Sequence, residues 1–259
     1  MKKAIIIMIA SLSLTLLVST SIFLFTMDKI DLSEYEIDFD YGTLSEEQIA
    51  VMNDILSCSK TGETTIEHNI KTNAEFDEVI AYIGFYFGTN LKHMNVALRR
   101  NGYAIVKPEL LRELERDKAV LDSEIDRILS KMYEGSDRFK LWQISNYIAA
   151  AMQYSISLDD IDPLSGQAGK GSCMTYSMLF YKMARRIDIQ AHMCDGYAFN
   201  GVRVGAHAWN MVVLNGEQYF YDVTWYDTIF REPWLLHDKT GWGRSYSVLP
   251  DKKTIIKEG

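Results

Sequence analysis

The sequence predicts a protein of mixed helices and strands, in which helices come first and the C-terminal part is rich in strands. Apolar residues recur every three or four positions in residues 75–87 and 110–129, which is the helical period. The same period follows Ser172. Asn215-Gly216 separates two alternating apolar runs, and this pattern predicts a β-hairpin with a two-residue turn.

The N-terminal segment differs from the rest of the chain. Lys2 and Lys3 precede residues 4–27, which carry no charged side chain. At about 1.5 Å per residue, a helix of that length can cross a hydrocarbon core of roughly 30 Å. The apolar stretch is long for a signal peptide and ends without a good cleavage site, so we favour a membrane anchor over a cleaved signal. Basic residues before it and acidic residues after it predict a single-pass protein of the cell membrane with its bulk outside, or a secreted protein if the segment is cleaved.

The helices and strands expected after this segment are predicted from the spacing of apolar residues, from helix-capping residues and from residues that interrupt regular structure. Residues 28–43 are acidic and irregular, like a stalk. Gly135-Ser136 interrupts the helical pattern, so we place a boundary there, with an N-terminal α/β region over 28–135 and a catalytic domain over 136–259. Helices are expected at 45–57, at 75–87, from 108 to the break at Gly135-Ser136, at 137–153 and at 172–187. Strands are expected at 64–67 and 102–106.

Charge and cysteine content limit the partners and the redox chemistry. All but two of the 27 basic residues, and all 35 acidic residues, follow residue 27. Such an acidic part repels phosphate backbones, which argues against nucleic acid as a partner. The three cysteines are Cys58, Cys173 and Cys194, and an odd number leaves at least one thiol free. A Cys58–Cys194 pair would leave Cys173 free, although the sequence does not establish that pair.

Cys173 is the candidate nucleophile. Ser172 is a favourable N-cap, so Cys173 is expected in the first turn of a helix. Unpaired backbone N–H groups and the positive helix end favour a thiolate there. The face made by Tyr176, Leu179, Phe180, Met183 and Ile187 is expected to pack inward. An inert buried cysteine is the structural alternative.

His207 and Asp222 are the candidate partners of that thiol. The predicted turn pairs Leu214 with Glu217, which sets Trp209 opposite Asp222 and His207 opposite Thr224. His207 and Asp222 then share one face of the hairpin as diagonal neighbours, roughly 7–8 Å apart at the backbone. Their side chains can therefore meet, with the carboxylate orienting the imidazole toward the thiol.

Other residues near these three are weaker candidates. Gln167 lies six residues before Cys173, and its amide could donate to an oxyanion beside the Cys173 backbone N–H. Trp209 and Tyr197 are candidates for the cleft wall, as is Tyr154, with core packing as the competing interpretation of each.

No metal site or cofactor is expected. His192 and Cys194 form an H-x-C pair, which is thin support for zinc without two further ligands at suitable spacing. His68, His93 and His237 have no recognisable partners in the sequence, and the catalytic region has no Gly-rich phosphate loop.

Four short segments carry a further signal: Gly169-Lys170-Gly171-Ser172-Cys173, Gly196-Tyr197-Ala198, His207-Ala208-Trp209-Asn210 and Asp222-Val223-Thr224-Trp225. In this order they resemble the transglutaminase-like superfamily, and in particular its bacterial members with a papain-like core. The resemblance covers roughly residues 136–228. It implies an α+β fold in which a nucleophile helix packs on an antiparallel sheet, and a Cys-His-Asp triad at Cys173, His207 and Asp222.

The resemblance also implies a range of activities. Family members include peptidases, amidases, protein cross-linkers and inactive scaffolds. We therefore expect an exported, membrane-tethered cysteine enzyme that acts on amide or acyl groups through a thioester on Cys173. Its substrate is expected to be a protein or peptide, with cell-wall peptide as one candidate. A catalytically silent binding module at the cell surface is the alternative, and the sequence does not give the oligomeric state.

Overall fold

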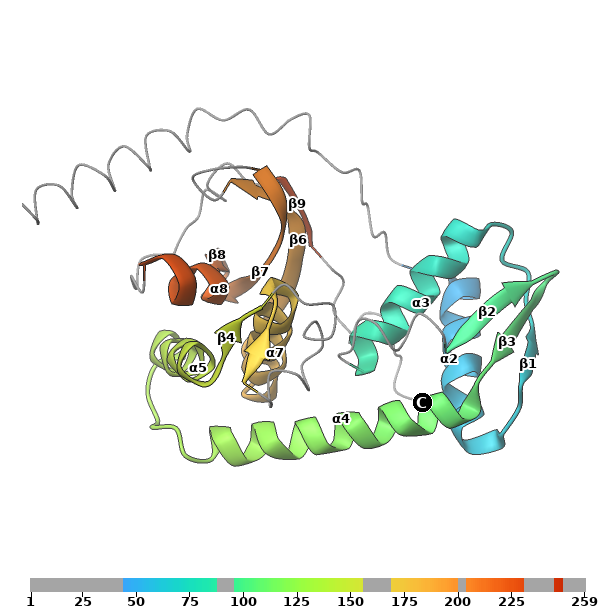
Figure 1. The fold of residues 1–259 in the computed structure, drawn as a ribbon, viewed down its shortest axis with the longest axis horizontal. Coiled ribbons are helices and arrows are strands. Elements are labelled where there is room, and N and C mark those ends of the chain that lie inside the picture. The colour runs from blue at the N-terminus through green and yellow to red at the C-terminus, as the bar shows by residue number, and fades with distance from the viewer. Residues whose placement is uncertain (1–43, 88–95, 156–168, 200–203, 231–244, 249–259) are drawn as a thin grey trace, which may run out of the picture.

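The computed structural model describes residues 44–87, 96–155, 169–199, 204–230 and 245–248, and these form a mixed helix-and-sheet fold (Figure 1). The predicted anchor over residues 4–27 lies outside this part. No helix within the described ranges combines the length and the apolar character needed to cross a membrane. The elements are α2 (Glu46–Thr61), β1 (Thr65–Glu67), α3 (Asn73–Phe87), β2 (Ala97–Arg100), β3 (Tyr103–Val106), α4 (Pro108–Leu129), α5 (Asp137–Ala151), β4 (Gln153–Tyr154), β5 (Lys170–Gly171), α7 (Cys173–Arg186), β6 (Ala191–Phe199), β7 (Val204–Leu214), β8 (Glu217–Tyr221), α8 (Val223–Trp225), η4 (Tyr226–Phe230) and β9 (Ser245–Val248).

The N-terminal elements build a small unit with its own core. Strands β1, β3 and β2 form an antiparallel sheet in that order, and helices α2 and α3 pack beside it (Figure 1). Ser45 starts α2 through a capping box, in which its hydroxyl accepts from the Gln48 N–H and the Gln48 side chain accepts from the Ser45 N–H. Fully buried Ile55, Val79 and Ile83 lie in the core of this unit.

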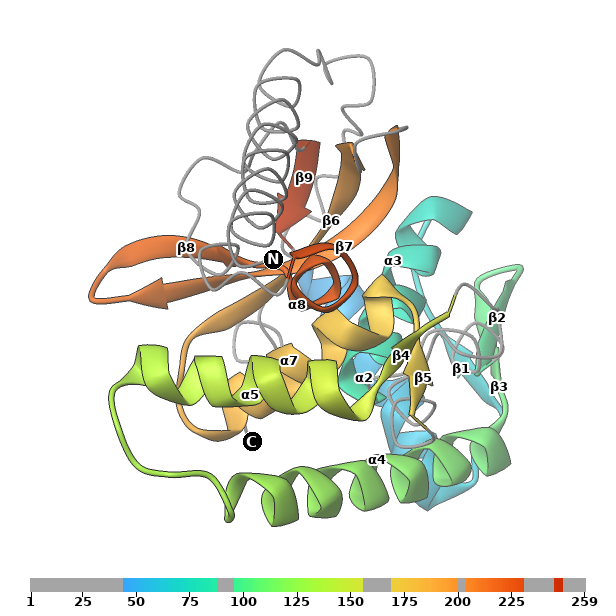
Figure 2. The same cartoon turned by 60° about the vertical axis from the view of Figure 1, so that its left-hand side comes forward.

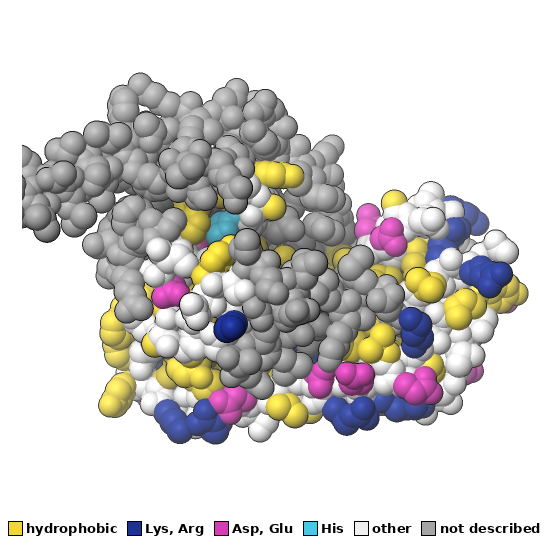
Figure 3. All heavy atoms as spheres, in the orientation of Figure 1, with side chains coloured by type: hydrophobic (Ala, Val, Ile, Leu, Met, Phe, Trp, Pro, Cys, Tyr) yellow, Lys and Arg dark blue, Asp and Glu magenta, His cyan; other side chains and the backbone are white. Residues whose placement is uncertain are grey.

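Helix α4 connects this unit to the rest of the described chain. It begins at Pro108, as predicted, and its apolar residues enter two different cores. Leu111 and Leu114 are buried with the N-terminal unit, whereas Leu121 and Ile125 are buried with the C-terminal one. Figure 2 shows α4 running below both units, and Figure 3 shows charged side chains of both signs along it. The helix is therefore a structural member of both.

The C-terminal unit is a four-stranded antiparallel sheet with helices on one side. The strand order is β8-β7-β6-β9, and α7 packs on β7 and β6 while α5 packs on α7. The inward face predicted for α7 is confirmed at Tyr176, Phe180 and Met183, which are buried, whereas Leu179 and Ile187 are only partly buried. The Phe180 ring stacks on that of Tyr221 from β8, with 5.3 Å between centroids. This packing fixes the start of α7 relative to the sheet.

The hairpin turn is the one predicted, but the second strand is shorter. Asn215 and Gly216 both have positive φ, as a type I′ turn requires, and Leu214 pairs with Glu217. The last pair is Asn210 with Tyr221, because β8 ends there and α8 follows. The expected pairings of Trp209 with Asp222 and of His207 with Thr224 are therefore wrong. The strand ends because the Asp222 side chain caps the start of α8.

Candidate active site

Cys173 occupies the first position of α7, directly after the N-cap Ser172. The predicted helix start is confirmed, although the Ser172 hydroxyl makes no capping hydrogen bond. Cys173 is partly exposed, whereas Cys58 and Cys194 are fully buried, and all three thiols are free. The Cys58–Cys194 pair considered from the sequence is not formed. Cys173 is thus the thiol that a solvent-borne reactant can reach.

The backbone before Cys173 is held by a short parallel pair. Strand β4 lies beside β5, with Tyr154 next to Gly171, and the Ser155 N–H donates to the Gly171 carbonyl at 2.8 Å. A Cβ on Gly171 would lie 2.5 Å from the Met152 Cε and 2.6 Å from the Thr175 Cβ, closer than real Cβ contacts come. Only glycine therefore fits at position 171, where β5 leads into α7.

Two polar contacts tie α7 to the elements that carry the other candidate residues. Asn210 of β7 is fully buried, and its Nδ2 donates to the Ser177 carbonyl at 3.0 Å and to the His192 carbonyl at 3.3 Å. The Tyr176 hydroxyl donates to the Asp227 Oδ2 at 2.8 Å. The nucleophile helix is thereby fastened both to the strand of His207 and to the segment that follows Asp222.

The structure brings His207 and Asp222 into direct contact. The His207 Nε2 lies 2.7 Å from the Asp222 Oδ2, and the Asp222 side chain is fully buried. The other carboxylate oxygen, Oδ1, accepts from the Trp225 N–H at 2.9 Å and so caps α8. Because Nε2 is engaged with Asp222, the ring nitrogen left for the thiol is Nδ1.

Two indole rings lie roughly parallel to the imidazole. The ring centroid of His207 is 5.8 Å from that of Trp209 and 5.1 Å from that of Trp225, with interplanar angles of 23° and 20°. Aromatic faces attract cations and exclude water from the ion pair. Trp225 was not singled out from the sequence, and the only local sign of its position is its place three residues after a helix-capping Asp.

The imidazole is biased toward its charged form. Burial disfavours the charge and lowers the pKa of His207, but the attraction and hydrogen bond of Asp222 raise it more. A hydrogen bond with the Cys173 side chain and the negative charge of that residue add to the rise, and the resulting pKa is about 9. At neutral pH the site therefore favours an imidazolium between a carboxylate and a sulfur atom.

The remaining candidates are placed less directly. Trp209 stacks on His207 but is fully buried, so it contacts the imidazole and presents little surface to a cleft. Tyr197 pairs with Ala206, whereas its neighbour Gly196 pairs with His207, so strand alternation directs Tyr197 to the other face of the sheet. Gln167 lies outside the described residues, and its oxyanion role stays a prediction.

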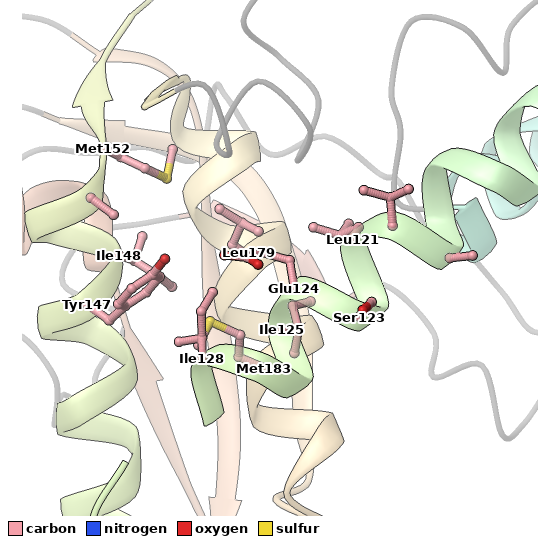
Figure 4. A pocket seen from close by; sticks show the side chains of 13 residues that line it. Leu121, Ser123, Glu124, Ile125, Ile128, Tyr147, Ile148, Met152, Leu179 and Met183 are labelled. Carbon is pink, nitrogen blue, oxygen red and sulfur yellow. The ribbon is translucent and has the colours of Figure 1, made fainter. Parts of the chain in front are cut away.

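None of Cys173, His207 and Asp222 lines a separate hollow. It has a volume of about 700 Å³ and lies between α4, α5 and α7, where Ile125, Ile148 and Met183 line it with aliphatic groups (Figure 4). Met152 lies at its upper end in this view. In the described ranges no group of three or more His, Cys, Asp or Glu side chains could hold a metal ion.

Comparison with known proteins gives a family match over part of the chain. Residues 126–226 match the family model of the Transglutaminase-like superfamily. Two similar solved structures are a candidate cysteine protease from Cytophaga hutchinsonii, 19% identical with a TM-score of 0.35, and a TGase, 13% identical with a TM-score of 0.36. These alignments cover 41% and 65% of this chain, which spans 37% and 52% of the two structures. No curated protein matched the chain. Residues 126–226, which hold Cys173, His207 and Asp222, are therefore the part of this chain that is similar to the transglutaminase-like superfamily.

Proposed function

We propose that this chain is a cysteine enzyme that acts on amide or acyl groups of proteins or peptides through a thioester on Cys173. The observation that carries the proposal is the His207–Asp222 contact of 2.7 Å, made by an imidazole whose pKa the neighbouring Cys173 side chain also raises. A thiol, an imidazole and an orienting carboxylate in this order form the machinery of an activated nucleophile.

The chemistry follows from the charges at the site. The Cys173 sulfur attacks the carbonyl carbon, and the π electrons move to the carbonyl oxygen, near the N-terminal end of α7. His207 then gives its proton to the departing amine as the C–N bond breaks, which leaves the acyl group on sulfur. Water or a second amine resolves the thioester, so hydrolysis and cross-linking use the same three residues. Asp222 keeps the imidazole oriented and compensates its charge throughout.

The proposal includes a location and a class of target. Residues 4–27 anchor the chain in the cell membrane, with the catalytic domain on the outer side, and the acidic composition of the exported part makes a nucleic-acid target improbable. The substrates are proteins or peptides of that compartment, including peptides of a cell wall.

Alkylation tests the activated thiol without knowledge of the substrate. An ordinary thiol with a pKa near 8.5 is only about 0.3% ionised at pH 6, so an imidazolium-paired thiolate reacts with iodoacetamide at least about tenfold faster there. We expect His207→Ala to remove this excess rate and His192→Ala, on the neighbouring strand, to leave it unchanged. Mass spectrometry of the Cys173 peptide gives the rate, with Cys173→Ala as the blank. Equal rates in wild type and His207→Ala would refute the proposal and leave the silent scaffold as the better interpretation.

A second assay separates hydrolysis from transfer. Casein cleavage and incorporation of a fluorescent amine into casein are measured side by side. Both activities are expected to vanish in Cys173→Ala, and the larger of the two in wild type identifies the acceptor, water or amine.

A further inference from the structure

Three exposed aromatic residues gather on α5 and on the connection that leads into it from α4. Tyr133, Phe139 and Trp142 have exposed fractions of 77%, 37% and 42%. The rings of Phe139 and Trp142 stack, with 5.8 Å between their centroids. The Gln143 side chain accepts from the Tyr133 N–H and donates to the Tyr133 carbonyl, both at 2.8 Å, and so holds Tyr133 beside the same helix. We call Tyr133, Phe139 and Trp142 the aromatic patch.

The aromatic patch lies on the face of α5 that points away from the core. Leu141, Ile144 and Ile148 are buried in the core that α5 shares with α7. At about 100° per residue, Trp142 and Phe139 lie about 100° and 160° around the helix from Leu141. Figure 3 shows hydrophobic side chains at the edge of the molecule where α5 and the end of α4 lie. Packing within the described part of the chain therefore leaves much of each ring in solvent.

The charge around the aromatic patch differs from that of the whole chain. The chain has 35 acidic residues against 27 basic ones. In α5, by contrast, Asp137 at the N-terminal end is the sole acidic residue, and Arg138 and Lys140 are basic. The connection before it adds Lys131 and Glu134, and Glu134 is paired with Lys140 at 3.1 Å. This weakly basic region does not repel anionic lipid headgroups as the acidic remainder would.

Exposed aromatic rings with basic side chains nearby are typical of proteins at a membrane surface. Trp and Tyr favour the level of the headgroups, and Lys reaches the phosphates with its long side chain. The predicted anchor over residues 4–27 would keep a bilayer close. Residues 28–43 can span at most roughly 55 Å, whereas α4, with 22 residues, is about 33 Å long. The connection is therefore long enough for the α5 end of the molecule to reach the bilayer.

We propose that the aromatic patch lies on the outer surface of the phospholipid bilayer that holds residues 4–27. This inference rests on the location proposed above. The rings of Tyr133 and Trp142 lie at the level of the headgroups, Phe139 contacts the upper part of the acyl chains, and Lys131 faces lipid phosphates. Because α5 packs on α7, this contact also sets the orientation of the nucleophile helix relative to the membrane.

Quenching of tryptophan emission by brominated lipid tests this contact on the full chain. The protein is reconstituted into vesicles of phosphatidylcholine and phosphatidylglycerol, with acyl chains either brominated near the headgroup or unbrominated. We expect brominated lipid to quench part of the wild-type emission, and Trp142→Phe, which keeps an aromatic ring, to lose that quenched part. Trp209 and Trp225 are buried and should contribute little to it.

A second variant moves the reporter to another exposed apolar position. Trp142→Phe combined with Leu98→Trp keeps the number of tryptophans at five and places one on β2, where Leu98 has an exposed fraction of 53%. We expect this variant to stay as weakly quenched as Trp142→Phe alone. Flotation of each protein with its vesicles is measured in parallel.

Each outcome decides the matter. Quenching that Trp142→Phe removes and Leu98→Trp does not restore supports the contact. Equal quenching in wild type and Trp142→Phe overturns it, and so does full restoration by Leu98→Trp, which would mean that the anchor alone brings the whole surface near lipid. A chain that does not float with the vesicles overturns the proposed location and this inference together. An ordinary alkylation rate at Cys173 overturns the proposed chemistry alone, because the quenching does not depend on the thiol.

Discussion

Replacing Asp222 by Asn should remove the charge of His207 with little change in shape. Asn keeps an oxygen for the Trp225 N–H, so the α8 cap survives, but the attraction that raises the pKa of His207 is gone. Burial then dominates, and we expect that pKa to fall to its ordinary value near 6.5 or below. One pKa unit corresponds to about 1.4 kcal/mol, so the rise to about 9 in the wild type represents about 3 kcal/mol in favour of the imidazolium.

The sign of the pH dependence follows from that raised pKa. A group whose pKa is higher in the folded state than in the unfolded state stabilises the fold. For His207 this contribution is complete when the pH is below the unfolded-state pKa of about 6.5, and it is lost as the pH rises through the folded-state pKa of about 9. The free energy of unfolding of the wild type should therefore drop between pH 6 and pH 10 by about 3 kcal/mol more than that of Asp222→Asn.

Two measurements check this expectation. NMR titration of the five histidine rings, with His207→Gln to identify the signal of His207, should give a midpoint near 9 in the wild type and a much lower one in Asp222→Asn. Urea denaturation at pH 6 and pH 10 gives the stability difference. A wild-type midpoint near 6.5, or one that the substitution leaves unchanged, would show that the carboxylate does not hold the charge.

Two further predictions concern the approach to the nucleophile and the acid step. Gly171→Ala should destabilise the protein by about 1–3 kcal/mol in urea denaturation, because its Cβ would meet Met152 and Thr175, whereas Gly205→Ala, which meets nothing within 4 Å, should be nearly neutral. Equal stability of the two variants would contradict the packing argument. The rate of amide cleavage or transfer should fall above about pH 9, where His207 loses the proton that the leaving amine needs, and a rate that keeps rising to pH 10.5 would exclude His207 as the acid.

Local signals explain why much of this site could be read from the sequence. The Asn-Gly turn alone determines the pairing of Leu214 with Glu217, and from it the register of β7 and β8. The apolar period after Ser172 likewise determines which face of α7 is buried. These features depend on neighbours a few residues away, so the pattern of a single chain is sufficient to predict them.

The features that the sequence did not predict are of two kinds. Some depend on which of two local structures a segment adopts, and others depend on contacts between residues far apart in the chain. At Asp222 the hairpin pattern favoured a longer strand, but the Asp side chain caps α8 and ends it. The β4–β5 pair joins only two residues on each side, across an interval of about fifteen residues, and so has no period to detect. Strand β9 completes the sheet beside β6 from far along the chain, and only the folded structure shows this neighbour.

The long helix α4 has a practical consequence for anyone dividing this protein. The family match begins at residue 126, and the break predicted from the sequence lies at Gly135, yet Leu121 and Ile125 belong to the core beneath α7. A fragment that starts at either point would leave part of that core uncovered and would lack Asp126 or its helical support, to which Arg186 of α7 is paired at 2.6 Å. A truncation that begins before Pro108 keeps the whole helix, and should yield the better-behaved recombinant fragment.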